Sequence, residues 1–216
     1  MDDQAVNKFY IEKRLTTLCE TLKKKGFGAQ FAPDKASAKQ MMLDQIPEGA
    51  TVIFTGSQTL EQIGVKPYLL ETDKYNVLNP YAPGLDKAAG IAVRKRGLTA
   101  DVMLSSSNAV TDDGCLVNVD GQGNRVAGMI FGPEKVVLAM GANKVVPDVS
   151  SAFQRLEEVA RPMNNIRIGL PNPCTKTGYC QDCNSPTRIC NYFSIIERCH
   201  IPGRIHVVLI GENVGY

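Results

Sequence analysis

The sequence predicts an α/β protein with a mostly parallel sheet and flanking helices. Short runs rich in Val and Ile alternate along the chain with longer amphipathic segments, and this order of elements is typical of a parallel sheet. The chain has 216 residues and 44% hydrophobic residues, enough to bury one sizeable core. We therefore expect a single domain over residues 1–216.

Amphipathic spacing predicts the helices. The first covers residues 3–25 with these apolar positions: Val6, Phe9, Tyr10, Leu15, Leu18, Cys19 and Leu22. Asp34 is the expected N-cap of a second helix that reaches about residue 46, and a third begins near residues 57–59. A helix over residues 84–97 is expected to turn inward Leu85, Ala88, Ala89, Ala92 and Val93. A helix over residues 148–160 has one apolar face: Val149, Ala152, Phe153, Leu156 and Val159.

The predicted strands are short apolar or β-branched segments. They cover residues 29–32, 51–55, 75–78, 102–105, 115–119, 135–140, 166–169 and 205–210. Asp113–Gly114 has the composition of a hairpin turn. Residues 171–202 form a cysteine-rich segment that we expect to be an irregular excursion between the last two strands.

Two loops are candidate binding sites for a small carboxylate or phosphate. In FTGSQTL, residues 54–60, a strand ends in Gly-Ser before a helix, and the N–H groups at a helix start attract anions. An ordinary tight turn with a serine cap would look the same. The second loop, residues 105–128, is dense in glycine and polar residues, and ligands bind where parallel strands end. The candidate ligand-binding residues are Gly56, Ser57, Thr59, Asn108, Asp113, Gly114, Gly121, Gly123, Asn124, Arg125 and Lys144.

The second loop and its surroundings carry a family resemblance. The segment TADVMLSSSNAVTDDGCLVNVDGQGNRVAGMIFGPEKVVLAMGANKVV, together with GSQTLEQIG near residue 56, resembles the LUD domain, the lactate-utilisation family that includes lactate-utilisation protein C. This resemblance covers nearly the whole chain. It implies a fold similar to ribose-5-phosphate isomerase, glucosamine-6-phosphate deaminase and the CoA transferases, and a part in oxidising lactate or a related hydroxy acid.

The order of motifs is similar to that of ribose-5-phosphate isomerase, with an aspartate-rich turn, a glycine loop and then an acid–lysine pair. On this resemblance the candidate catalytic groups are Asp112, Asp113 and Glu134, although no general base is assigned. The chain departs from the isomerase pattern where an acidic motif is replaced by Ser105, Ser106, Ser107 and Asn108. Sugar-phosphate isomerisation is therefore the weaker reading, and it remains undecided whether the chain alone is an enzyme.

Five of the seven cysteines fall in the last fifth of the chain. Four of them have the spacing Cys174-x5-Cys180-x2-Cys183-x6-Cys190, and four thiolates can hold a [4Fe–4S] cluster or a tetrahedral zinc ion. Basic residues outnumber acidic ones around them, which favours an anionic iron–sulfur cluster. The family resemblance implies the same, because lactate-utilisation systems are similar to iron–sulfur redox assemblies, and it implies that the cluster passes electrons to redox partner subunits. The alternatives are a structural zinc site in a small-anion-binding or regulatory module, and free or oxidised thiols.

The composition argues against other function classes. A net charge of +2 and the absence of Trp give no reason to expect nucleic-acid binding. No run of roughly 18 apolar residues occurs, so no membrane span is expected. The N-terminal residues are charged throughout and lack the apolar stretch of a signal peptide, so we expect a cytoplasmic protein.

Overall fold

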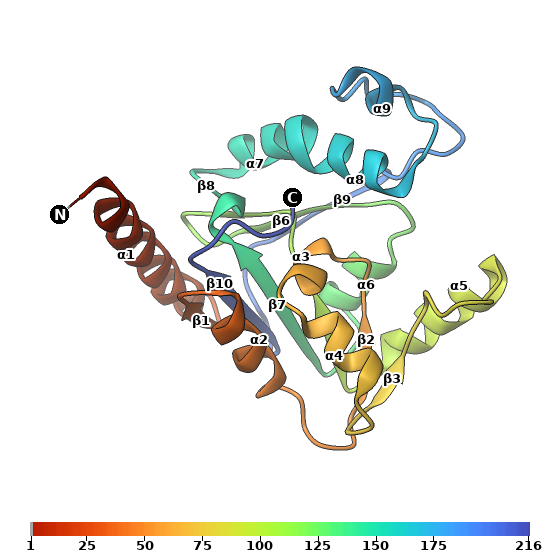
Figure 1. Ribbon diagram of the computed structural model, residues 1–216, viewed down its shortest axis with the longest axis horizontal. Helices are drawn as coiled ribbons and strands as arrows, with labels where there is room; N and C mark the ends of the chain where they lie inside the picture. The colour runs from red at the N-terminus through yellow and green to blue at the C-terminus, as the bar shows by residue number, and fades with distance from the viewer. Residues whose placement is uncertain (1) are drawn as a thin grey trace.

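The computed structural model describes residues 2–216 and is built around a six-stranded sheet in which all neighbouring strands are parallel (Figure 1). The strand order is β1-β10-β7-β4-β2-β3. The strands are β1 (Gly28–Ala32), β2 (Thr51–Phe54), β3 (Asn76–Leu78), β4 (Val102–Ser105), β7 (Lys135–Gly141) and β10 (Ile205–Ile210). The central strands are buried on both faces, which explains their continuous apolar runs in the sequence.

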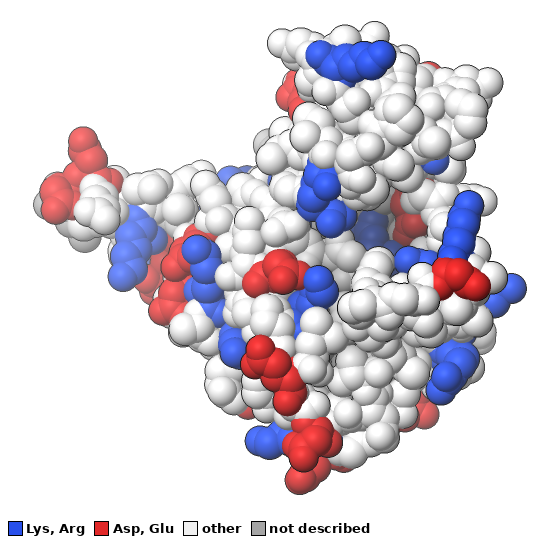
Figure 2. All heavy atoms as spheres, turned by 45° about the vertical axis from the view of Figure 1, so that its right-hand side comes forward, with Lys and Arg blue, Asp and Glu red and all other residues white. Residues whose placement is uncertain are grey.

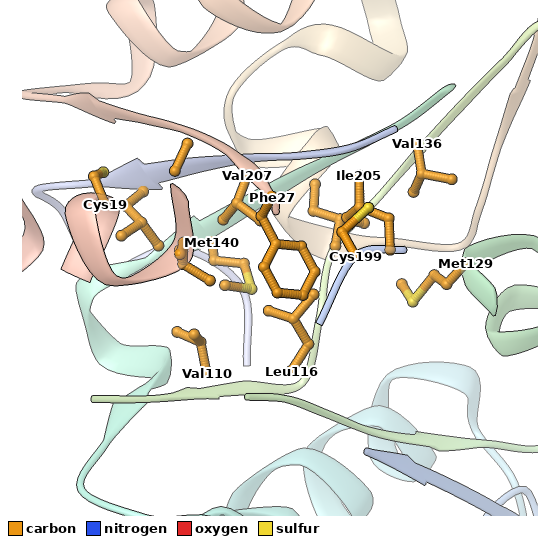
Figure 3. Close-up of a cluster of buried hydrophobic side chains, with 14 of the residues drawn as sticks. Cys19, Phe27, Val110, Leu116, Met129, Val136, Met140, Cys199, Ile205 and Val207 are labelled. Carbon is orange, nitrogen blue, oxygen red and sulfur yellow. The ribbon is translucent and has the colours of Figure 1, made fainter. Parts of the chain in front are cut away.

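Each face of this sheet has its own apolar core. On one face α2 (Lys35–Leu43), α3 (Gln58–Gln62) and α4 (Val65–Glu71) pack against the sheet through residues such as Met42, Leu60 and Leu69. On the other face lie the C-terminal half of α1 (Asp3–Lys24) and α6 (Asn124–Ile130). Figure 3 shows this second core, in which Phe27 and Met140 meet side chains of a smaller second sheet.

The second sheet has four strands in the order β8-β5-β6-β9. They are β5 (Ala109–Thr111), β6 (Leu116–Asp120), β8 (Val145–Val146) and β9 (Tyr192–Ile196). Strands β5 and β6 are antiparallel, and Gly114 in the turn between them has a φ of +87°, which confirms the hairpin turn predicted at Asp113–Gly114. The outer face of this sheet packs against α7 (Val149–Arg155).

The prediction of a strand at residues 166–169 is wrong. A single turn of π-helix (Leu156–Ala160) joins α7 to α8 (Arg161–Ile168), so helix continues to Ile168 and ends at Gly169, whose φ is +73°. The alternation of Ile166, Arg167 and Ile168 resembled a strand. Both isoleucines are about half exposed, as expected for the outer side of a surface helix rather than for a buried strand.

Residues 171–202 are less irregular than expected. They include the short helix α9 (Pro173–Thr177) and the edge strand β9, while residues 178–191 contain neither helix nor strand. Strand β9 pairs with β6, so the segment returns to the body through the second sheet. The segment follows α8 instead of the strand predicted at residues 166–169, so its predicted place between the last two strands is wrong.

Two predicted apolar faces are buried only in part. In α1 the residues from Leu15 onward enter the core, whereas Val6, Phe9 and Tyr10 are exposed on the end that projects from the body (Figure 1). In α5 (Lys87–Arg96) only Gly90 is buried. Of the five residues predicted to turn inward, Leu85, Ala88 and Ala92 are exposed. Among residues 2–216, no helix is long and apolar enough to cross a membrane.

Candidate functional site

A cavity of about 660 Å³ opens where β2, β4 and β7 end. Because these three strands are neighbours and parallel, their carboxyl ends lie side by side, and the residues that follow them meet there. The cavity is lined by Thr55–Thr59, Glu61, Lys66, Tyr81, Arg94, Ser105–Asn108, Val119–Gln122, Asn124, Arg125, Lys144, Ala160, Arg161, Asn164, Arg167, Ile168, Ile189, Cys190 and Tyr216. Its floor comes from the main sheet and its upper wall from α8 and the cysteine-rich segment.

Lys144 lies at the base of this cavity and is only 2% exposed. Its Nζ donates to Thr59 Oγ1 at 3.0 Å, to Ser106 Oγ at 2.9 Å and to the Ser107 carbonyl at 3.4 Å. All three acceptors are neutral. Burial, together with the nearby guanidinium groups of Arg155 and Arg125, lowers the pKa of Lys144 to about 7, because removing an ammonium group from water disfavours its charged form.

Arg125 holds the two polar loops together. Its guanidinium donates to the Ser106 carbonyl at 3.0 Å, the Asn118 side chain at 2.6 Å, the Asn108 side chain at 2.7 Å and the Val119 carbonyl at 2.6 Å. Burial lowers its pKa from the usual range. With these donors committed to the protein and Asp120 Oδ2 lying 3.8 Å from its Nε, Arg125 fixes the shape of the cavity wall.

The cavity carries an excess of positive charge. Six basic and two acidic side chains line it. Of the two acids, Glu61 is paired with Lys66 at 2.6 Å, and Asp120 accepts hydrogen bonds from four backbone N–H groups at the start of α6. Figure 2 shows basic side chains at the hollow between the body and the upper part of the molecule, where α8 and α9 lie in Figure 1. Such a cavity favours an anionic ligand.

Two of the lining arginines are available to a ligand. Arg94 stacks on the Tyr81 ring, with its guanidinium carbon 5.2 Å from the ring centroid. Arg167 donates to Asn164 Oδ1 at 2.8 Å and to the Gly56 carbonyl at 3.5 Å. Among residues 2–216, neither arginine has a carboxylate within ion-pair distance, in contrast to Lys66.

The cysteine-rich segment is held together by polar contacts. Between residues 171 and 191 only Asn172 and Cys174 are buried. The Asn172 side chain donates to Asn165 Oδ1 at 2.6 Å and to the Thr187 carbonyl at 3.0 Å. Arg188 donates to the carbonyls of Cys183 and Cys190. A segment of this size without an apolar core gains little stability from burial.

The four predicted cysteine ligands are free thiols in this segment. Burial, followed by the neighbouring Cys183 and Cys180, raises the pKa of Cys174. Burial and Cys180 also raise the pKa of Cys190, against the lowering effect of Arg161. The thiols therefore influence one another electrostatically. Within residues 2–216, however, no three His, Cys, Asp or Glu side chains stand together as a metal-ligand set.

The cysteine-rich segment and the cavity are in contact. Cys190 lines the cavity, and Asn165 Nδ2 lies 3.9 Å from its Sγ. Arg161, which also lines the cavity, donates to Cys180 Sγ at 3.3 Å and stacks on Phe193. A π-helical turn, Leu156–Ala160, lies immediately before Arg161, and such turns are frequent at functional sites.

The structure brings most of the predicted ligand-binding residues together. Those that line the cavity are Gly56, Ser57, Thr59, Asn108, Gly121, Asn124, Arg125 and Lys144. Gly123 does not line it but begins α6 with a φ of +82°. Asp113 and Gly114 lie at the far end of the β5–β6 hairpin against α1, where Lys25 Nζ is 3.4 Å from Asp113 Oδ2. Ligand binding by these residues stays a prediction.

The three candidate catalytic acids lie outside the cavity. Asp112 forms an ion pair with Arg14 of α1 at 3.0 Å, and Asp113 accepts from Thr111 and Lys25. Glu134 is exposed just before β7 begins, at the opposite edge of the sheet from the cavity. In this geometry Asp112 and Asp113 fasten the hairpin to α1.

Sequence reasoning missed several cavity residues. Ser106 stood in a run of serines noted only as a departure from a known motif. From the sequence, Arg161 and Arg167 are predicted only as part of the positive charge around the cysteines, and Arg167 falls in the strand predicted at residues 166–169. No spacing in the sequence marks these two arginines, because positions six apart on an α-helix do not share one face.

The fold and the site define an α/β protein with a cavity lined mainly by polar and basic side chains at the carboxyl edge of a parallel sheet. The chain matches the LUD domain over residues 15–210, and it belongs to the LUD domain family. Among solved structures it is similar to a DUF162 family protein from Deinococcus radiodurans, with 12% identity, a TM-score of 0.55, and coverage of 93% of this chain and 98% of that one.

That likeness shows the fold alone. The chain is also similar to a D-ribose-5-phosphate isomerase in complex with phospho-erythronic acid, with 16% identity, a TM-score of 0.33, and coverage of 62% of this chain and 65% of that one. A likeness this slight carries no argument about ligand or activity. No curated protein matches the chain.

Proposed function

We propose that this chain binds a small carboxylate or phosphate in the cavity and holds an iron–sulfur cluster in the cysteine-rich segment. In this role it takes part in the oxidation of lactate or a related hydroxy acid, as its family's association with lactate utilisation suggests. The cluster would pass electrons to a partner subunit. The observation that carries the proposal is that Cys190 lines the same cavity as Lys144 and Arg167.

The anion-binding half of the proposal rests on charge. Lys144, Arg94 and Arg167 line the cavity, and none of them forms an ion pair with a carboxylate of residues 2–216. A bound anion would neutralise them and would favour protonation of Lys144, whose pKa of about 7 leaves it only partly charged at neutral pH. Carboxylate and phosphate oxygens also match the donors that an arginine presents.

The cluster half rests on the donor set and its surroundings. Four thiols occupy a segment whose only buried residues between 171 and 191 are Asn172 and Cys174. An inorganic centre would supply the stability that an apolar core does not. Arg161 and Arg188 offset the charge of thiolate ligands, and N–H···S contacts such as that from Arg161 to Cys180 tune the potential of a cluster.

Cluster binding requires the loop to rearrange. The sulfurs do not yet stand as a ligand set, but Cys180 and Cys183 lie on a stretch without helix or strand. A metal centre commonly orders the segment that binds it. When bound, an iron–sulfur cluster supplies one-electron transfer; the residues of this chain would hold the anion in place and keep its charge neutralised.

The test of the cluster is metal and sulfide analysis of protein purified without oxygen. We expect iron and acid-labile sulfide in a fixed ratio to protein, with broad absorbance near ~400 nm. The variant Cys180→Ser should lose the iron, whereas Cys115→Ala is the matched control because Cys115 lies on the β5–β6 hairpin. Colourless protein with stoichiometric zinc would contradict the cluster and support the structural zinc alternative.

The test of the ligand site is calorimetric titration with lactate, pyruvate and inorganic phosphate. We expect one of these anions to bind, and binding near pH 8 to be accompanied by proton uptake as Lys144 becomes charged. Proton uptake is measured by repeating the titration in buffers of different ionisation enthalpy. Failure of all three anions to bind would refute the ligand half, independently of the metal analysis.

A further inference from the structure

Ser106 and Lys144 form a buried pair of a hydroxyl and an amine at the cavity. The two atoms, Oγ and Nζ, are 2.9 Å apart, and both residues line the cavity. Ser106 is 8% exposed and Lys144 2%. A serine becomes a strong nucleophile when a base lies within hydrogen-bond distance and a third group orients that base.

The third group is Thr59. Its Oγ1 accepts from Lys144 Nζ at 3.0 Å, and the Ser107 carbonyl accepts at 3.4 Å. The C-terminal segment also lies close to the Lys144 amine, because a Cβ built on Gly215 would be only 3.0 Å from Nζ. Nζ is therefore held behind Ser106 rather than presented freely to the cavity, which suits a base more than a nucleophile.

Lys144 can act as a base because a large fraction of its amine is unprotonated near neutral pH. Among residues 2–216, no carboxylate forms an ion pair with Lys144, and the positively charged Arg155 and Arg125 lie near it. Burial and these cations lower its pKa to about 7. A neutral amine has a lone pair, so the Ser106 hydroxyl can turn from the Ser107 carbonyl, to which it donates at 3.1 Å, and donate to Nζ instead.

The other serines around the cavity are engaged elsewhere. Ser105 Oγ is hydrogen-bonded to Thr55 Oγ1 at 2.8 Å. Ser107 Oγ donates toward the Ala109 carbonyl at 3.0 Å. Ser57 Oγ accepts from the Leu60 N–H at the start of α3. Ser106 is thus the one among these four whose hydroxyl faces an amine.

We propose that Ser106 and Lys144 form a serine–lysine catalytic pair that transfers the acyl group of an ester or thioester. Ser106 Oγ attacks the acyl carbon while its proton passes to Lys144 Nζ. The bond to the leaving alcohol or thiol then breaks, and Lys144 returns the proton to the leaving group. Water cleaves the acyl-serine in the same way, giving a carboxylic acid and the free Ser106 hydroxyl.

The cavity selects the class of acyl group. Its volume of about 660 Å³ accommodates a small molecule, and its excess of basic side chains favours an acyl group or a leaving group that carries negative charge. The same positive charge would stabilise the oxyanion that forms when Oγ attacks the acyl carbon. This activity is independent of the cysteine-rich segment and of the proposed oxidation.

The test uses a fluorophosphonate probe, which labels activated serines, and p-nitrophenyl acetate. Probe-treated protein is digested and the modified peptide is identified by mass spectrometry. We expect label on Ser106 in the wild type, none there in Ser106→Ala, and at least a 100-fold slower reaction in Lys144→Met. The matched controls are Ser150→Ala and Lys87→Met, because both residues are exposed on other helices.

A pH profile separates catalysis from a structural effect. The labelling rate of the wild type should rise with pH through neutrality and then level off, as Lys144 loses its proton. In Lys144→Met this inflection should vanish, while a single cooperative thermal unfolding transition shows that the variant is folded. Wild-type protein without label on Ser106, or the same inflection in both proteins, overturns the proposal.

Reduction with borohydride in the presence of pyruvate provides an independent check. If Lys144 is the base behind Ser106, its mass should stay unchanged. A pyruvyl adduct on Lys144 would instead show that the amine itself attacks a carbonyl carbon, and it would overturn the proposal. The Lys144→Arg variant keeps a positive charge but cannot accept a proton, so it should remain as slow as Lys144→Met.

Discussion

Replacing Lys144 with methionine should change how the stability of the protein depends on pH. The folded protein holds Lys144 at a pKa of about 7, against a usual value of 10.5. Between these two pH values the unfolded chain binds one more proton than the folded protein does at this position. Stability therefore rises with pH across this range, by about 1.4 kcal/mol per pH unit. This contribution is fully present above pH 10.5 and is lost as the pH falls toward 7.

The Met variant lacks this titrating group. Between pH 7.5 and 9.5, the free energy of unfolding of the wild type should gain roughly 2–3 kcal/mol relative to Lys144→Met. Cysteine and tyrosine side chains also titrate in this range, but they are common to both proteins and cancel in the difference. Below pH 7, Lys144 is protonated in both states, so the difference should become constant.

The assay is urea unfolding of both proteins at four pH values from 6.5 to 9.5. The exposed Lys87→Met variant serves as the control and should run parallel to the wild type. Parallel curves for the wild type and Lys144→Met would refute the reasoning, because they would mean that Lys144 keeps an ordinary pKa in the folded protein. The assignment of Lys144 as a base would then fail as well.

Three further predictions concern other residues of the site. Arg125→Met should cost about 3–5 kcal/mol of stability, because it removes four hydrogen bonds from a buried guanidinium to buried or half-buried acceptors. Urea unfolding beside the exposed Arg96→Met measures this loss, and a loss below about 1 kcal/mol would contradict the prediction. Arg167→Gln should weaken anion binding by about tenfold, or about 1.4 kcal/mol, without changing the melting temperature. Calorimetry at two salt concentrations measures the affinity, and an unchanged affinity would show that Arg167 does not contact the ligand. Gly141→Ala should cost about 1–3 kcal/mol of stability, because the new Cβ would lie 2.6 Å from the Val214 backbone nitrogen. An unchanged melting temperature would contradict this prediction and would show that the C-terminal segment moves aside.

The main sheet could be predicted because its strands obey local rules. Strands β4 and β10 have the predicted bounds, residues 102–105 and 205–210, since a parallel strand buried on both faces appears in the sequence as a nearly continuous apolar run. The sequence also indicates that the loops containing Gly56 and Asn108 lie at the same edge of the sheet. Strands β2 and β4 end there side by side, and the carboxyl ends of parallel strands are where α/β sheets bind ligands.

The second sheet could not be predicted in the same way. Strand β8 has two residues and β5 has three, too few to show a period. Strand β9 exposes Tyr192, Phe193 and Ile195, and its place is set by pairing with β6, more than 70 residues earlier in the chain. Pairing over such a distance leaves no local pattern. The extension of α7 into α8 was missed because a π-helical turn shifts the helical period.

The burial of Lys144 was invisible for a related reason. In the sequence it is one lysine after a strand, and such a residue is usually exposed. Its burial depends on Thr59 and Ser106, which follow two other strands. Only the order of β2, β4 and β7 in the sheet brings the three residues together. The chemistry of the site is thus set by topology, and residue type alone does not reveal it.

Arg161 connects the two halves of the proposed function. It lines the cavity, donates to Cys180 Sγ at 3.3 Å and is 6% exposed, and its Nε has no hydrogen-bond partner among residues 2–216. A buried guanidinium with an unused donor is costly unless another acceptor approaches it. A bound anion on the cavity side, or thiolate ligands on the other side, would supply one. Because both would draw on the same positive charge, a change of charge at the cysteines should alter anion affinity. Arg161→Met should remove that coupling while leaving Lys144 in place.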